Sequence, residues 1–200
     1  MTFSLIGRCA RTGQFGAVVT TSAVGVGARV PFAQAGVGAV LTQHRTDPRL
    51  GPFGIDLLAR GFTAQQTVDA VVAATPHRDW RQVAVIDTAG RTAHFDGARV
   101  RPAISVAHGR DCVAAGNILR NEAVAPAMVA QFEADLAMGL ADRLVRAILA
   151  GEDAGGETAS LVSASLLVVD RESFPFVDLR VDAHDAPLVE LARLWALYGP

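Results

Sequence analysis

The sequence contains no lysine: all 18 of its positively charged residues are arginines. This absence excludes catalysis through a lysine Schiff base, including the chemistry of pyridoxal phosphate enzymes. It also leaves the α-amino group at the start of the chain as the only aliphatic amine in the molecule. Such an amine has a pKa of about 7.7–8.0, against about 10.4 for a lysine, so a modest downward shift leaves it largely neutral at pH 7.

Cysteine and long apolar segments are also scarce. Cys9 and Cys112 follow no disulfide or metal-binding pattern, and we expect both to be small buried residues in a reducing compartment. The least polar stretch, residues 18–41, is rich in glycine and interrupted by polar residues and a proline, so we do not expect it to span a membrane. The first ten residues lack the pattern of a secretory signal. The sequence therefore predicts a cytoplasmic protein with no membrane partner.

Metal, cofactor and nucleic-acid binding have little support in the sequence. The 18 arginines nearly balance 20 acidic residues and form no cationic run, which argues against nucleic acid as a partner. The glycines of residues 22–36 do not follow the dinucleotide fingerprint, and no G-x-S-x-G motif is present. The histidines are scattered, and none lies in a metal-binding motif. We expect no metal and no cofactor; the histidines are His44, His77, His94, His108 and His184.

The hydrophobic pattern predicts one domain over residues 1–200, with strands and helices in alternating groups. Apolar residues at helical spacing indicate helices around 55–58 and 63–75, two more within 122–150, and a last one from 185 to 197. Residues 22–36 read as a loop. Strands are expected at residues 2–10, 15–21, 37–43, 82–87, 91–95, 104–108, 112–115, 163–170 and 176–181. Because several strands are consecutive, the pattern favours two mainly antiparallel sheets between helical layers, an α+β fold.

Thr2 is the first candidate for catalysis. If Met1 is removed, Thr2 carries both a hydroxyl nucleophile and the free amine that can accept the proton of that hydroxyl. The structural alternative is that Thr2 simply begins a strand, because a small residue at this position needs no catalytic purpose.

Eight stretches in order along nearly the whole chain closely resemble the DUF1028 family of uncharacterised proteins. They are residues 2–4 (TFS), 23–29 (AVGVGAR), 35–43 (AGVGAVLTQ), 46–52 (TDPRLGP), 114–119 (AAGNIL), 155–157 (GGE), 163–164 (SA) and 177–182 (VDLRVD). That family is grouped with the N-terminal nucleophile (Ntn) hydrolases, whose fold is a four-layer αββα sandwich. The resemblance implies that Thr2 attacks an amide carbonyl and that its own amine manages the proton. Well-known Ntn hydrolases also use a nearby lysine, which this chain lacks, so Arg29, Arg49 or hydrogen bonds alone would have to tune the amine.

Two further residues are candidates for stabilising charge in such a reaction. Asn117 follows Gly116 and offers an amide or backbone N–H to a developing oxyanion, although a turn asparagine bonded to local backbone explains it equally well. Ser22 ends the second strand, which a hairpin would bring beside the first, in a register that the sequence does not fix.

The remaining candidates are assigned to substrate binding. Gln43, His44, Asp47 and Arg49 form the densest polar cluster, directly after an apolar strand. A solvated turn is the favoured interpretation for His44 and Asp47, while the planar fork of Arg49 suits a substrate carboxylate. Glu157 and Ser163 flank the last buried strand. Glu157 is a candidate for binding a substrate amine, and hydration in a glycine-rich loop is its structural alternative.

Two functions remain open at this point. The first is an Ntn-type amidohydrolase that cleaves a small amide, with Thr2 as nucleophile, its amine as base, and Asn117 or Ser22 stabilising charge. The second is a non-catalytic binding or assembly module that keeps the same fold and retains Met1. In either case a homo-oligomer is expected only by analogy with other αββα sandwiches.

Overall fold

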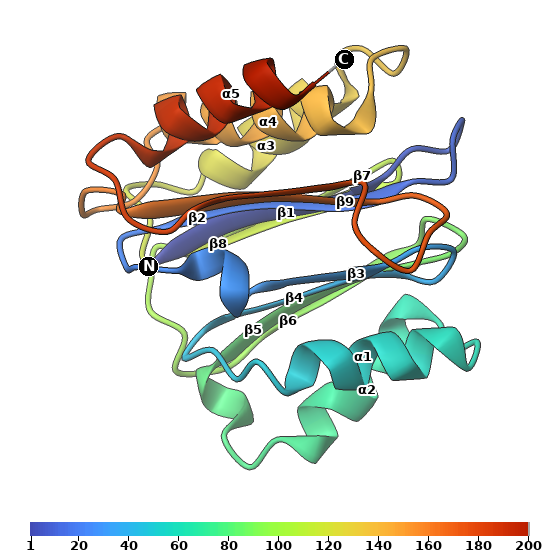
Figure 1. Cartoon of the computed structure of the whole chain (residues 1–200). Helices are drawn as coiled ribbons and strands as arrows, with labels where there is room; N and C mark the ends of the chain where they lie inside the picture. The colour runs from blue at the N-terminus through green and yellow to red at the C-terminus, as the bar shows by residue number, and fades with distance from the viewer. Residues whose placement is uncertain (200) are drawn as a thin grey trace.

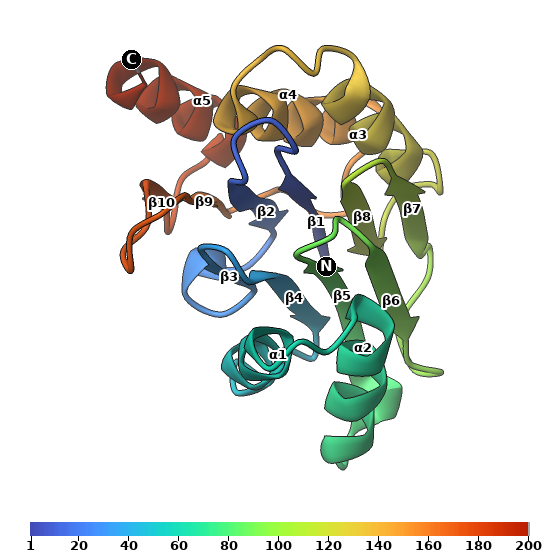
Figure 2. The same ribbon diagram turned by 90° about the vertical axis from the view of Figure 1, so that its right-hand side faces the viewer.

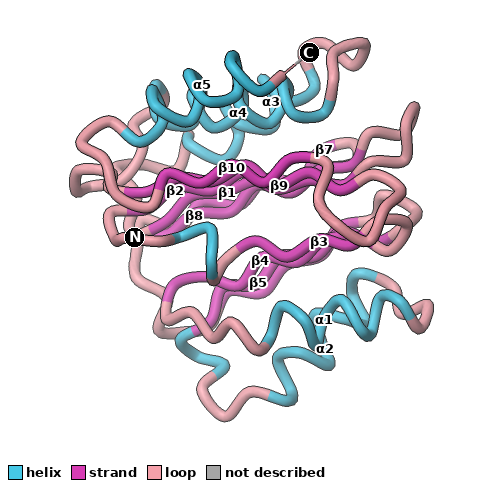
Figure 3. The backbone as a smooth tube through the Cα atoms, in the orientation of Figure 1, coloured by secondary structure: helices cyan, strands magenta, loops and turns pink. Residues whose placement is uncertain are grey.

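The computed structural model describes residues 1–199 and shows four layers (Figure 1). Two antiparallel sheets face each other, and helices cover the outer face of each, as the tube view also shows (Figure 3). The predicted α+β fold, a four-layer αββα sandwich, is confirmed. The structure contains no helix within residues 1–199 that is long and apolar enough to cross a membrane.

The larger sheet has six strands in the order β10-β9-β2-β1-β8-β7, and all neighbours are antiparallel. The strand at its centre, β1, begins the chain, so the first residues lie in the interior of the sheet. The strands are β1 (Thr2–Arg8), β2 (Phe15–Thr21), β7 (Ser105–Gly109), β8 (Cys112–Asn117), β9 (Ser163–Val169) and β10 (Val177–Val181).

The smaller sheet has four antiparallel strands in the order β3-β4-β5-β6. They are β3 (Pro31–Gln34), β4 (Gly38–His44), β5 (Arg81–Asp87) and β6 (Thr92–Asp96). The short edge strand β3 and the 3₁₀ turn Val26–Ala28 lie within residues 22–36, for which a loop was expected; that expectation was wrong. Four residues that begin with a proline give too short a pattern to predict a strand, and β3 exists because it pairs with β4.

Five α-helices form the two outer layers. The helices α1 (Leu50–Ala59) and α2 (Ala64–Ala74) cover the smaller sheet, and α3 (Val124–Glu133), α4 (Leu140–Asp153) and α5 (Pro187–Tyr198) cover the larger one (Figures 1 and 2). The capping box predicted at Thr63 and Gln66 is present at the start of α2. Helix α4 extends three residues beyond the expected end at position 150.

Alternation along β1 divides the core into two parts. Phe3 and Leu5 point toward α3 and α4 and are fully buried there, whereas Ile6 belongs to the apolar cluster between the sheets. Ser4 points the same way as Ile6, because its hydroxyl reaches a glutamine on β4. Thr2 therefore also faces the space between the two sheets, at the end where the chain starts.

Candidate functional site

A row of polar side chains crosses the larger sheet at the start of β1. Thr2 lies directly opposite Asn117 on β8, and Thr21 on β2 lies opposite Ser163 on β9. Thr2 and Thr21 are also neighbours, because their hydroxyl oxygens are 3.3 Å apart. All of these residues are buried. Figure 2 shows the N-terminus between the strands of the two sheets rather than on an outer face.

Met1 covers the hydroxyl group of Thr2. The carbonyl oxygen of Met1 accepts hydrogen bonds from the hydroxyls of both Thr2 and Thr21. The sulfur of Met1 lies 3.2 Å from the hydroxyl of Thr158. With Met1 in place, Thr2 is only 6 % exposed, and the free amine belongs to Met1.

The terminal amine and Glu157 influence each other electrostatically at this site. Burial lowers the pKa of the terminal amine; the Glu157 carboxylate opposes this shift, while the positive charges of Arg101 and Arg45 add to it. Burial raises the pKa of Glu157 to about 7, although the positive amine and the bond from Ser22 act against the rise. Burial thus shifts the pKa of the amine downward and that of Glu157 upward, and shifted pKa values are common at functional sites.

Glu157 has an unused hydrogen-bonding oxygen. Its side chain is almost completely buried, and Oε2 accepts a 3.1 Å hydrogen bond from the backbone N–H of Ser22. Oε1 has no partner among residues 1–199. Since a buried carboxylate oxygen without a partner costs stability, this atom is available for a group that the isolated chain does not supply.

A chain of buried amides fixes the orientation of Asn117. The carboxylate of Asp96 can only accept hydrogen bonds, so the group of Gln82 that donates to it, at 2.8 Å, must be the Nε2 amide nitrogen. The Oε1 of Gln82 then accepts from Asn117 Nδ2 at 2.9 Å and from Gln43 Nε2 at 2.6 Å. As a result, Asn117 Oδ1 has no partner in the described chain, and only the second hydrogen on Nδ2 is free to donate.

The backbone just after Asn117 is strained. Ile118 has a φ of 55°, a left-handed conformation that β-branched residues rarely adopt. The N–H of Ile118 donates to the carbonyl of Arg101 at 3.1 Å, and Thr158 N–H donates to the carbonyl of Ile118. Such conformations concentrate at functional sites because the surrounding structure must hold them.

Ser22 and Ser163 contribute in different ways. Ser22 contacts Glu157 through its backbone N–H, whereas the hydroxyl that reaches Thr2 belongs to its neighbour Thr21, which the sequence did not single out. Ser163 donates to the carbonyl of Ala23 at 2.6 Å and accepts from Val26 N–H at 3.1 Å, so its side chain holds the loop after β2. In the β1–β2 hairpin Phe3 lies opposite Thr20, so the next residue of β2, Thr21, is the one that lies beside Thr2.

The cluster after β4 is divided between the site and the outer surface. Gln43 belongs to the amide chain and accepts a 2.8 Å hydrogen bond from Ser4. His44 Nδ1 lies 2.9 Å from the carbonyl oxygen of Trp80, and burial lowers the pKa of His44. Asp47 binds Arg49 at 2.8 Å and Arg81 at 3.6 Å.

Asp47 and Arg49 line a separate hollow beside α1 and α2. None of the other predicted site residues borders this hollow. Neither Arg49 nor Arg29 is among the charges that act on the amine; Arg45 and Arg101 take that place. Arg49 is instead paired with Asp47 in the loop before α1, and tuning of the Thr2 amine by Arg29, Arg49 or hydrogen bonds stays a prediction.

A more voluminous hollow lies elsewhere on the surface. It has a volume of about 700 Å³ and lies between β3 and the loop that joins β9 to β10, with Phe32 and Arg180 in its walls. We place the candidate site at Thr2 instead, because the unpartnered buried atoms of Asn117 and Glu157 lie there. No group of three or more His, Cys, Asp or Glu side chains within residues 1–199 is arranged to hold a metal ion.

Comparison with known proteins identifies the family. The profile of DUF1028, a family of unknown function, matches residues 2–191. The crystal structure of protein SPO2555 from Silicibacter pomeroyi, described as a DUF1028 protein, superposes with a TM-score of 0.92 at 28 % identity, covering 100 % of this chain and 86 % of that one.

Anbu (ancestral beta-subunit) from Yersinia bercovieri matches with a TM-score of 0.44 at 10 % identity, over 98 % of this chain and 94 % of that one. The search of curated proteins finds no match. On the profile and the SPO2555 superposition, the chain belongs to the DUF1028 family.

Proposed function

We propose that this protein is an Ntn-type amidohydrolase that cleaves a small amide after removal of Met1. One observation carries the proposal: the Thr2 hydroxyl, 3.3 Å from that of Thr21, lies at the buried end of a central strand beside a terminal amine and Glu157. The four-layer fold and the DUF1028 resemblance to Ntn hydrolases support it. Removal of Met1 gives the free amine to Thr2 and takes away the carbonyl that occupies both threonine hydroxyls.

The reaction follows from the groups present. The neutral amine of Thr2 accepts the proton of Oγ1 as this oxygen attacks the amide carbonyl carbon. We assign to the free N–H of Asn117 Nδ2, on the residue opposite Thr2, the stabilisation of the oxyanion that develops. When the C–N bond breaks, the leaving amine takes the proton from the Thr2 ammonium, and an ester remains on Oγ1. Water then hydrolyses this ester, with the amine again accepting a proton, and releases the acid.

Thr21 and Glu157 have supporting roles in this scheme. The hydroxyl of Thr21 orients that of Thr2, and the negative charge of Glu157 holds the amine close to Oγ1 once the amine is protonated. Burial, aided by the positive charges of Arg101 and Arg45, lowers the pKa of the terminal amine, which Met1 carries in this structure. We expect the same surroundings to favour the neutral, basic form of the Thr2 amine once Met1 is removed. Gln43 and Gln82 keep Asn117 oriented.

Thr2→Ala tests the proposal, with Thr2→Ser as the matched variant. Amine release from a panel of acyl p-nitroanilides should be abolished by alanine and retained by serine, which keeps a hydroxyl. Intact mass should show the same loss of Met1 in all three proteins, since alanine and serine are no larger than threonine. Equal turnover by wild type and Thr2→Ala refutes the proposal.

The competing function is a binding or assembly module that retains Met1. It is favoured by the close fit of Met1, whose carbonyl and sulfur both contact side chains of the site. Intact mass of the purified protein separates the two functions, because hydrolysis requires the loss of one methionine and the binding module does not.

A further inference from the structure

Three arginines near the site have no acidic partner. We call Arg45, Arg99 and Arg101 the arginine cluster; all three are exposed, and none forms an ion pair with any residue from 1 to 199. The chain has enough acids to pair them, because its net charge is −2. Their isolation is thus a local property of this region rather than a shortage of carboxylates.

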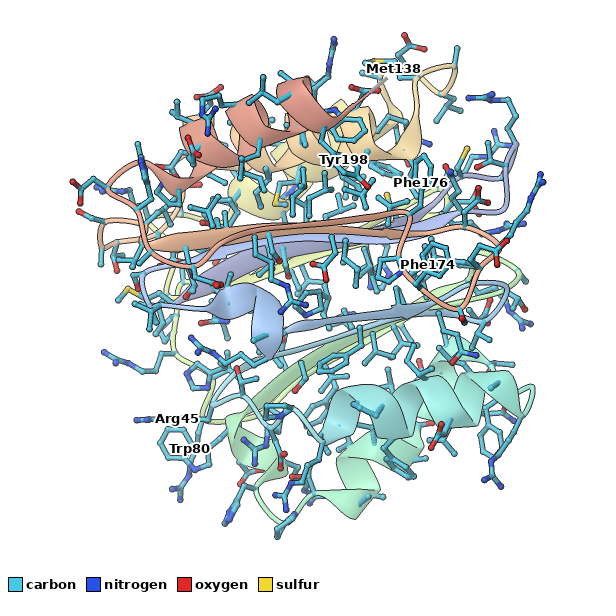
Figure 4. All side chains as sticks on the ribbon, viewed as in Figure 1. Arg45, Trp80, Met138, Phe174, Phe176 and Tyr198 are labelled. Carbon is cyan, nitrogen blue, oxygen red and sulfur yellow. The ribbon has the colours of Figure 1, made fainter. Side chains whose placement is uncertain are left out.

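Trp80 holds two of the arginines in place. The guanidinium carbons of Arg45 and Arg99 lie 5.7 Å and 5.4 Å from the centre of a Trp80 ring, within the range of cation–π attraction. The ring of His44 is parallel to that of Trp80 within 7°. The N–H of Arg45 also donates to the carbonyl of Trp80 at 3.2 Å. Figure 4 shows Arg45 beside Trp80, at the same side of the view as the N-terminus in Figure 1.

The cluster is connected to Thr2 through the backbone of both sheets. The carbonyl of Arg101 accepts a hydrogen bond from the backbone N–H of Ile118. Ile118 directly follows Asn117, and Asn117 lies opposite Thr2 in the sheet. Arg45 follows His44, the last residue of β4, and is two residues beyond Gln43 of the amide chain. Burial is the main cause of the lowered pKa of the Met1 amine, and the charges of Arg101 and Arg45 add to it, so both arginines act on this amine electrostatically.

Other arginines of the same region are already neutralised. Arg81 is buried and binds Asp47, the carbonyl of Arg45 and Thr75, and Arg49 also binds Asp47. A hollow of about 310 Å³ is lined by Arg45, His77, Trp80 and Arg81. Arg45 is the member of the arginine cluster that lines this hollow, and its free guanidinium group beside the Trp80 ring is suited to bind a planar oxyanion through paired N–H donors.

We infer that the substrate is an amide that also bears a carboxylate, which Arg45 and Arg101 bind while its carbonyl carbon faces Thr2 Oγ1. This inference deepens the proposed function and rests on it for the position of the scissile bond. A neutral amide of the same size lacks a partner for the two guanidinium groups. The arginine cluster is therefore a specificity determinant, and Arg49, which Asp47 neutralises, is not.

The test uses the single aliphatic amine, so it does not depend on turnover. Acetyl transfer from N-hydroxysuccinimide acetate is compared with transfer from its sulfonated form, since both leave the same adduct and differ by one negative charge. The rate at the α-amine is followed by peptide mass mapping. Steering by two unpaired arginines should make the sulfonated reagent at least about threefold faster, relative to a model peptide, at low salt. At about 1 M salt the Debye length is about 3 Å, and the preference should vanish.

The double variant Arg45→Gln/Arg101→Gln should lose this preference, whereas Arg193→Gln should keep it. Arg193 is a matched control because it is exposed on α5 and pairs with Glu190. Equal preferences in wild type and the double variant overturn the inference.

In a second arm, glutarate should slow acetylation of the α-amine while glutaramide does not. Protection by inorganic phosphate and not by glutarate overturns the assignment to a carboxylate. Thr2→Ala should keep the preference, so loss of turnover in that variant bears only on the proposed function.

Discussion

Replacing Glu157 with glutamine should stabilise the protein above neutral pH, although it removes a polar group of the site. The side chain is 2 % exposed, and burial raises its pKa to about 7 from an ordinary value of 4.5. Glutamine has the same shape, carries no charge, and keeps an oxygen that can accept from the Ser22 N–H. The ionised wild-type carboxylate is buried without most of the hydration that it has in the unfolded chain, and the variant avoids that cost.

The magnitude follows from the two pKa values. Between pH 4.5 and 7 the unfolded chain has lost the Glu157 proton while the folded chain retains it, so wild-type stability relative to the variant falls as the pH rises. The interval is about 2.5 pH units at about 1.4 kcal/mol each, which gives about 3 kcal/mol. For a chain of 200 residues this corresponds to a difference in Tm of roughly 6–12 °C above pH 8 and almost none below pH 4.5.

Thermal unfolding followed by circular dichroism from pH 4 to 9 measures this difference. Glu122→Gln is the matched control, because that side chain is exposed, and its curve should run parallel to that of the wild type. Parallel curves for wild type and Glu157→Gln would contradict the electrostatic description of the site. Turnover by Glu157→Gln should fall, so that stability and activity change in opposite directions.

Three further substitutions test separate parts of the structure. Thr21→Val removes the hydroxyl beside Thr2 without changing shape, and turnover should fall about tenfold with little change in Tm. Gln82→Leu leaves the amide of Asn117 without its acceptor, so chemical denaturation should show a loss of roughly 1–3 kcal/mol for each orphaned buried group. Gly7→Ala brings a methyl group within 2.8 Å of a Phe132 ring carbon, and should cost roughly 1–3 kcal/mol, part of which Phe132→Leu should restore.

Most of the fold was predictable because its signals are local. Nine of the strands contain enough β-forming residues to be predicted from the sequence, and the capping box at Thr63 marks the start of α2. The edge strand β3 was missed because its four residues carry no pattern of their own and form a strand only by pairing with β4. Helix α4 continues to Asp153 through a glycine, where a propensity argument ends it too early.

The candidate site was only partly predictable, since its members depend on register. Thr2 could be identified from its position in the chain, Asn117 from its place after Gly116, and Glu157 from its place before the last buried strand. Thr21 could not, because a shift of one residue in the hairpin would turn its hydroxyl to the opposite face. Arg45 and Arg101 lie in separate loops, and only tertiary structure shows that both act on the amine.

The most direct measurement is the position of a trapped acyl group. The protein that has lost Met1 is mixed briefly with p-nitrophenyl acetate, quenched in acid, and mapped by mass spectrometry with and without hydroxylamine, which cleaves esters and spares amides. We predict an acetyl ester on Thr2 Oγ1 that hydroxylamine removes and that decays on longer incubation, and no such ester in Thr2→Ala or in protein that retains Met1. Acetylation confined to the α-amine, or an ester that forms equally with Met1 in place, would contradict a catalytic role for Thr2.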